Sequence, residues 1–388
     1  MTKIEGILAR EVLDSRGDPA LEVELKTDDG IHVISSVPSG ASVGTHEAVE
    51  LRDSDQERFS GLGVLKAVAN VNEKISKALN GAEVEKQQNI DQTMIDLDAT
   101  AHKSALGANS ILAVSIAVCK AAAISKKLSL FEYIGILSDF KDFKMPSVMF
   151  NFIEGAKHAS NNLDIQEFLA IFDKKTFREN YQKSAETFHR LGKTLKERSL
   201  VSSVGFEGGF APNLPSDEDA LSLLSESTDL KIALDLAGVS PKGITLAQIV
   251  QKYPVISLED PAAEDDWETW SSLTSQFGSK VNIVGDDLLA SNSERLVEAV
   301  DKKACNGVII KPNQIGTVSE TIKFSNLAKS SNLKTIVSHR SGETEDTFIA
   351  DFAVGVGSDF VKFGAPSRGE RIAKYNRLLR IEESLSGI

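Results

Sequence analysis

Alternating apolar and polar positions mark the first third of the chain. "LEVEL" (21–25) and "IHVISSV" (31–37) alternate as half-buried strands do, and the turn signal "DDG" separates them. Helical patterns follow at 64–79 and 109–125, and the second is apolar on nearly every side, which predicts a buried helix. A meander followed by helices predicts an α+β domain over residues 1–133.

The pattern in residues 134–388 is different. Six apolar runs recur at intervals of roughly 25 residues, and each ends in a titratable residue: Asp235, Glu259, Asp286, Lys311, His339 and Lys362. Helical patterns lie between them, and "SNSE" (291–294) and "TVSE" (317–320) both fit the S/T-x-x-E capping box. Repeated strand–loop–helix units predict an α/β fold, a TIM-like (β/α)8 barrel.

The run "GVIIKPNQIG" (307–316) shows why the strand ends matter. Three β-branched residues predict a buried strand, Lys311 follows them, and Pro312 stops the pairing. A single lysine at such a position is more often solvated than catalytic. Because active sites of these barrels lie at the carboxyl ends of the strands, six such endings together favour one shared site.

Three of these endings are carboxylates, Asp235, Glu259 and Asp286, which repel one another unless a cation joins them or some are protonated. Oxygen ligands favour Mg²⁺ over Zn²⁺. The alternative is that they are helix N-cap acids, which suits Asp287 better than all three together.

The other three endings, Lys311, His339 and Lys362, are bases, and acids facing bases suggest abstraction of a proton beside a carboxylate. Each lysine can instead form a salt bridge with an acid, and for Lys362 the spacing leaves that alternative open.

Earlier segments add candidates. Gln166 and Glu167 lie in an apolar run, and Glu207 precedes two glycines that let a ligand approach the backbone. The glutamates are candidates for an acid and its partner, and a tight turn with an exposed acid is an equal alternative for Glu207. Arg340 and Ser341 are candidates for binding phosphate.

Composition narrows the function classes. The formal net charge of -13 argues against nonspecific binding to nucleic acid or anionic membranes. Cys119 and Cys305 are far apart in apolar stretches, which favours free buried thiols. The charged start and the absence of an apolar run of membrane-spanning length predict a cytoplasmic protein. Walker A, GxGxxG and HExxH motifs do not occur.

Long strings along nearly the whole chain resemble the enolase family, the phosphopyruvate hydratases of glycolysis. They include "DSRGDPALEVEL", "SGASVGTHEAVELRD", "GANSILAVSIAV", "EGGFAPN", "NQIGTVSE" and "SHRSGETEDTFIAD". The resemblance implies a lyase that converts 2-phosphoglycerate to phosphoenolpyruvate and water with two Mg²⁺ per active site. It also implies a homodimer or higher homo-oligomer, in which Glu22 and Arg380 match positions that pair across the dimer interface.

The resemblance also implies roles for single residues. Lys311 is expected as the general base at C2, and Glu207 as the general acid for the 3-hydroxyl. The further catalytic candidates are Glu167 and Lys362. The expected metal ligands are Asp235, Glu259 and Asp286 for the first ion and Ser39 of a mobile loop for the second. The expected substrate contacts are His158, Gln166, Glu167, Glu259, Asp286, His339, Arg340, Ser341 and Lys362.

The chain departs from the family pattern at several positions. Phe206 stands where Asp is usual, Glu154 where Asn is common, and Val43 where Thr is usual, and the chain is shorter after "LDLAGVS". Two alternatives to the enolase interpretation therefore remain. One is a superfamily lyase acting on another carboxylate, against which the phosphate-binding "SHRSG" argues. The other is a weakly active binding scaffold, against which the intact acids and Lys311 argue.

Overall fold

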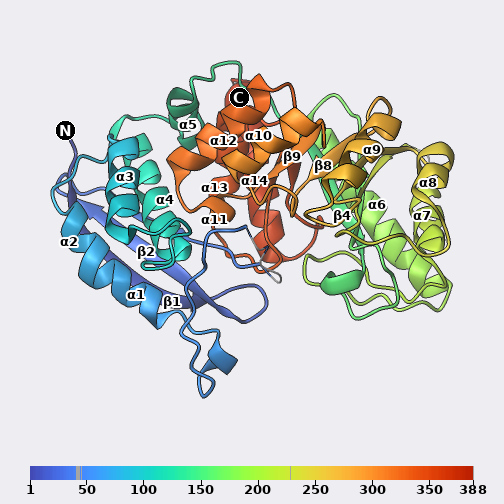
Figure 1. The fold of residues 1–388 in the computed structure, drawn as a ribbon, viewed down its shortest axis with the longest axis horizontal. Coiled ribbons are helices and arrows are strands. Elements are labelled where there is room, and N and C mark those ends of the chain that lie inside the picture. Colours follow the sequence, from blue (N-terminus) through green and yellow to red (C-terminus); the bar gives the residue numbers. More distant parts are fainter. Residues whose placement is uncertain (41–43, 45, 228, 388) are drawn as a thin grey trace. The chain divides into compact units, whose positions relative to one another are not determined.

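The computed structural model describes residues 1–40, 44, 46–227 and 229–387 (Figure 1). Contacts between residues divide the chain into two compact units. The first contains Met1–Lys144, Lys311–Asn326 and Gly342–Gly357, and the second contains Met145–Ile310, Leu327–Ser341 and Ser358–Ile388. Two segments from the C-terminal half therefore group with the N-terminal unit. The domain boundary between residues 133 and 134 stays a prediction.

The first unit contains the meander that the alternation predicts. Strands β1 (Ile4–Leu13), β2 (Pro19–Thr27) and β3 (His32–Ser36) form an antiparallel sheet in that order. The described helices of this unit are η1 (Phe59–Gly61), α1 (Leu65–Ala69), the π-helix η2 (Asn70–Ile75), α2 (Ser76–Leu79), α3 (Gln87–Asp98), α4 (Ala108–Ser125), α5 (Leu130–Ser138), α11 (Pro312–Ile315) and α13 (Phe348–Gly355). Helix α12 (Val318–Ser330) has residues in both units.

Helix α4 forms the centre of this unit, and α3 lies beside it (Figure 1). Its 18 residues have a mean hydropathy of 1.6, so the helix is long and apolar enough to cross a membrane. The expectation that no apolar run reaches that length is therefore wrong. The structure nevertheless buries 83% of the helix, which packs on β2 and β3 as a core helix does.

The second unit is a closed eight-stranded barrel in the order β10-β11-β4-β5-β6-β7-β8-β9. Its strands are β4 (Ser147–Glu154), β5 (Glu167–Ile171), β6 (Lys231–Asp235), β7 (Val255–Glu259), β8 (Asn282–Gly285), β9 (Gly307–Ile310), β10 (Lys334–Ser338) and β11 (Phe360–Lys362). Its described helices are η3 (Ala156–His158), α6 (Phe177–Glu197), α7 (Asp217–Ser225), α8 (Leu246–Lys252), α9 (Trp267–Phe277), α10 (Ser293–Lys302) and α14 (Gly369–Leu385). All six strands predicted from the apolar runs are present.

The barrel differs from a regular (β/α)8 barrel at β5, which runs antiparallel to both β4 and β6. The connection from β4 to β5 contains only the short η3, whereas a parallel neighbour needs a longer crossover. The reversal has a consequence for the site. Glu167, the first residue of β5, pairs with Asp235, the last residue of β6. A residue at the start of β5 therefore lies at the rim where the other strands end.

The two predicted capping boxes have different outcomes. Thr317 accepts the N–H of Glu320 and donates to its carboxylate, as predicted. The prediction for Ser291 is wrong, because Asn292 caps α10 and accepts the N–H groups of Glu294 and Arg295. Asparagine caps a helix as well as serine does, so the sequence rule placed the cap one residue early.

Candidate active site

The Lys362 side chain joins acids from three strands. It is 2% exposed, and its Nζ lies 2.8 Å from both carboxylate oxygens of Glu259, 3.2 Å from Asp235 and 3.3 Å from Glu167. Burial by itself lowers the pKa of Lys362, but the three carboxylates raise it well above its ordinary value. Lys362 is therefore a cation here, and the salt-bridge alternative for it is realised.

Glu207 faces two histidines and an amide. Asn151 Nδ2 donates to its Oε2 at 3.1 Å, His339 Nε2 lies 3.0 Å from the same oxygen, and His158 Nδ1 lies 3.6 Å from Oε1. The residue is 2% exposed, so the alternative of an exposed acid in a tight turn is wrong. Burial raises the pKa of Glu207, but His339, His158 and the Arg371 guanidinium outweigh it and hold it well below the usual range.

Arg371 was missed by the sequence analysis. It is fully buried, and it donates to His339 Nδ1 at 2.6 Å and to the carbonyl oxygens of Arg340, Ser341 and Phe206 at 2.7, 2.7 and 3.1 Å. Because a guanidinium only donates, Nδ1 of His339 accepts and the ring proton lies on Nε2, facing Glu207. Burial lowers the pKa of His339 to about 3, so the ring is neutral.

A signal for Arg371 was present in the sequence. In α14 the buried positions Arg371, Lys374, Tyr375 and Leu378 recur at helical spacing, so two charged residues share the buried face. A charge on such a face needs a polar partner, and for Arg371 that partner is the segment 339–341.

The remaining candidates lie as follows. Gln166 precedes β5 and donates to Asp235 Oδ2 at 3.3 Å. Lys311 directly follows β9 and is the N-cap residue of α11. In the first unit, the hydroxyl of Ser39 contacts Arg52, Arg16 and Glu50 at 2.6, 3.2 and 3.2 Å. Val43 of the small-residue loop lies outside the described residues.

The sequence comparisons address both units. The model of the enolase N-terminal domain matches residues 4–134, and the model of the enolase C-terminal TIM barrel domain matches residues 142–242 and 243–387. The chain is 46% identical to the enolase of Elusimicrobium minutum over 411 aligned residues, which cover 99% of this chain and 97% of the relative. It is also 46% identical to the enolase of Beutenbergia cavernae over 412, which cover 99% and 96%.

The chain belongs to the enolase family. Enolases are phosphopyruvate hydratases, which are carbon–oxygen lyases, so the fold class and the enzyme class expected from the sequence are confirmed. The break between residues 242 and 243 in the enolase barrel match falls in the connection between β6 and α8, where the sequence analysis expects a shortened loop. Cytoplasmic location and oligomeric state stay predictions.

The expected enolase metal ligands fit a hard cation by their chemistry. Asp235 and Glu259 are register partners at the ends of β6 and β7, and Asp286 directly follows β8. All three are buried carboxylates, as oxygen-selective Mg²⁺ requires. The helix-cap alternative fails, because the helices after these strands are capped by Thr245, Asp266 and Asn292.

A neighbouring acidic cluster in the described chain has a simpler explanation. Ligand atoms of Asp260, Asp286 and Asp287 lie within 4.8 Å of one another. However, the two carboxylate oxygens of Asp260 accept the N–H groups of Asp286 and Asp287, both at 2.9 Å. Asp260, which the sequence analysis missed, therefore positions the backbone that carries the candidate ligand Asp286.

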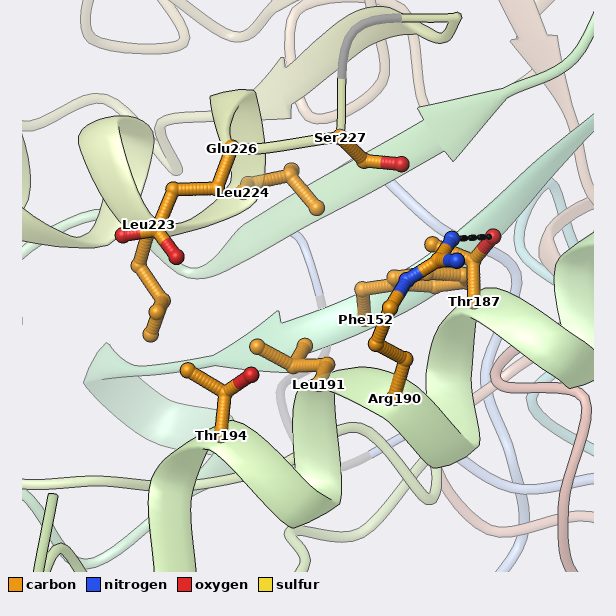
Figure 2. A pocket seen from close by; sticks show the side chains of 9 residues that line it. All are labelled: Phe152, Thr187, Arg190, Leu191, Thr194, Leu223, Leu224, Glu226 and Ser227. Atoms are coloured by element: carbon orange, nitrogen blue, oxygen red, sulfur yellow. Dashed lines mark hydrogen bonds between the residues drawn. The ribbon is translucent and has the colours of Figure 1, made fainter. Parts of the chain in front are cut away.

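A separate hollow lies on the barrel's outer side, between α6, α7 and β4 (Figure 2). It has a volume of about 150 Å³ and is lined by Phe152, Thr187, Arg190, Leu191, Thr194, Leu223, Leu224, Glu226 and Ser227. Arg190 donates to Thr187 there, as the dashed line shows. The hollow lacks the clustered acids and bases of the rim, so it is not the candidate active site.

Proposed function

We propose that this enolase family member dehydrates 2-phosphoglycerate to phosphoenolpyruvate in a Mg²⁺-dependent reaction. The observation that carries the proposal is the Lys362 cluster, in which one amine meets three buried carboxylates from three barrel strands. Buried charges are costly in a purely structural core, whereas a site that binds an anionic substrate and a metal ion requires charged side chains. The family membership supplies the substrate class.

Lys311 is the proposed general base. It directly follows the last residue of β9, a strand parallel to β8 and β10, and active sites of such barrels lie at the carboxyl ends of their strands. The uncharged amine accepts the C2 proton of 2-phosphoglycerate. The electron pair of the C2–H bond then forms the C2–C3 double bond as the C3–O bond breaks.

Glu207 is the proposed general acid: in this role it supplies the proton with which the 3-hydroxyl leaves as water. His339, held in one tautomer by Arg371, fixes the position of its carboxyl group. Glu167, His158 and Gln166 are the proposed neighbours of the substrate on the same rim. Arg340 and Ser341 are the proposed phosphate ligands, and Arg371 positions their backbone.

Asp235, Glu259 and Asp286 are the proposed ligands of one Mg²⁺, and Ser39 is the proposed ligand of a second. When bound, the metal supplies positive charge that stabilises negative charge developing on the substrate carboxylate. Lys362 is the proposed protein cation beside these acids, and it contacts the substrate.

The test follows phosphoenolpyruvate absorbance with purified protein, 2-phosphoglycerate and Mg²⁺, with and without a chelator. We expect chelator-sensitive turnover. Metal-bound protein without turnover would favour the scaffold alternative, and turnover only on another carboxylate would favour a different superfamily lyase. Lys311→Ala is expected to keep the fold and metal binding and to lose C2 proton exchange, so persistent exchange removes Lys311 from its role.

A further inference from the structure

Glu154 is a buried acid that the proposed reaction does not use. It is the last residue of β4 and is 0% exposed. Its Oε1 accepts the N–H of Gly209 at 2.5 Å, and its Oε2 accepts the N–H of Glu207 at 3.2 Å. The carboxyl group of Glu154 therefore binds the backbone of the loop that carries the candidate general acid.

A β-bulge in β4 makes this contact possible. In a regular strand, residues three apart point to opposite faces. The register of β4 on β5 shifts between Asn151 and Ile153, which adds a residue on β4 and lets Asn151 and Glu154 reach the same loop. Asn151 donates from Nδ2 to the Glu207 carboxylate, while Glu154 accepts from the Glu207 backbone.

A polar atom beside this contact has no partner among the described residues. Asn151 Oδ1 is buried without a hydrogen bond. A Cβ added to Gly209 would lie 3.2 Å from this atom and 2.9 Å from Oε1 of Glu154, so both oxygens approach the same point. A protonated Glu154 brings an O–H donor to that side of Gly209, and an ionised Glu154 brings none.

The charges around Glu154 favour the protonated form. Glu207 acts on it from the loop, Glu167 pairs with it from β5, and Arg371 acts on it from α14, whereas the His158 ring of η3 faces Glu167 and Glu207. Burial and the charge of Glu207 together raise the pKa of Glu154 to about 8, although the backbone N–H groups of Glu207 and Gly209 and the charge of Arg371 lower it in part.

We propose that Glu154 is a positioning residue for Glu207, because its carboxyl group accepts the backbone N–H groups of Glu207 and Gly209 and so anchors the loop. The inference rests on the proposed function, in which Glu207 is the acid. It also accounts for the departures from the family pattern. Phe206, where Asp is usual, is 42% exposed, so a carboxyl group lost at one side of the loop is replaced at position 154.

The position of Glu154 has a consequence for the pH dependence. In the wild-type protein Glu154 is neutral up to about pH 8, and its ionisation above that pH places a second negative charge beside Glu207. In Glu154→Gln no charge appears at that position at any pH. The change in kcat that the ionisation of Glu154 causes near pH 8 is therefore expected to be absent in the variant.

The experiment compares pH profiles of kcat and KM for wild type, Glu154→Gln and Asp217→Asn. Asp217 is a matched control, because it is also buried and accepts the N–H groups of Asp164, Ile165 and Lys242. We expect Glu154→Gln to lose about tenfold or more in kcat at pH 7.5, with KM within about twofold, and to lack the change in kcat near pH 8. A profile that superimposes on wild type, or an equal change in the control, overturns the proposal.

A second measurement needs no turnover. Infrared spectra of the wild-type protein should show a protonated carboxylic acid band that disappears near pH 8, and in Glu207→Gln the band should disappear at lower pH. A missing band, or one unmoved in Glu207→Gln, refutes a neutral Glu154 beside an ionised Glu207. If wild type shows the band without turnover, the proposed function fails and the position of Glu154 beside Glu207 stands.

Discussion

Replacing Lys362 with Met tests how much its ammonium group stabilises the three buried carboxylates at the barrel rim. The substitution keeps most of the side chain's volume and removes the ammonium group. Glu259, Asp235 and Glu167 then lose their contacts of 2.8, 3.2 and 3.3 Å, in a region where Lys362 is 2% exposed. Removing one partner of a buried ion pair typically costs about 3–5 kcal/mol, and we expect a loss of that size in the free energy of unfolding.

The assay is urea unfolding followed by circular dichroism at pH 7.5 in the presence of a chelator. Lys334→Met is the control, because Lys334 also pairs with an acid, Asp359, at 2.8 Å but has a side chain that is 53% exposed. Lys334→Met should lower the free energy of unfolding by less than about 1 kcal/mol. Adding Glu259→Gln to Lys362→Met should recover part of the stability, since one of the uncompensated charges is gone.

The reasoning is refuted if Lys362→Met destabilises the protein no more than Lys334→Met does. It is also refuted if Glu259→Gln and Lys362→Met are additive, because residues that share an ion pair should show a coupling energy of about 0.5–3 kcal/mol. Either result would mean that the three carboxylates are protonated or hydrated when the amine is absent.

Three further predictions follow from other residues. Because the pKa of Glu154 is raised to about 8 in the folded protein, its contribution to stability is complete below about pH 4.5 and is lost as the pH rises through about 8. In urea unfolding, the wild-type protein should therefore lose about 2–5 kcal/mol of unfolding free energy relative to Glu154→Gln between those pH values. Parallel pH dependences of the two proteins would contradict this. Arg371→Met removes a buried donor from three carbonyl oxygens and should cost about 3–5 kcal/mol by the same assay, whereas a cost under about 1 kcal/mol would show that water replaces it. Arg380→Glu reverses an exposed charge at the expected dimer interface and should lower the mass measured by light scattering, and an unchanged oligomer would remove Arg380 from that interface.

The sequence predicted most of the barrel because the physical signal is local. Each of the six apolar runs is short, β-branched and closed by a titratable residue, and a strand can be recognised from those residues alone. Parallel strands present their carboxyl ends at one rim, so the sequence alone assigns Asp235, Glu259 and Lys362 to a common site. Strand position and rim membership were therefore properties of the sequence.

The sequence did not determine the direction of β5. The apolar run around Glu167 is the same in either direction, and only the short connection from β4 decides that the strand is antiparallel. This direction puts Glu167 opposite Asp235. The bulge at Asn151 is equally hidden, because a register shift is a relation between two strands and not a property of one.

The sequence by itself determined the family, the barrel, and which acids and bases lie at its rim, since these depend on residue type and on periodicity along the chain. Tertiary structure alone decided the electrostatics: that Lys362 is a cation shared by three acids, that Arg371 fixes the tautomer of His339, and that Glu154 lies beneath the loop of Glu207. Such effects depend on burial and on distances of a few ångströms between residues far apart in the chain, and periodicity carries no information about either.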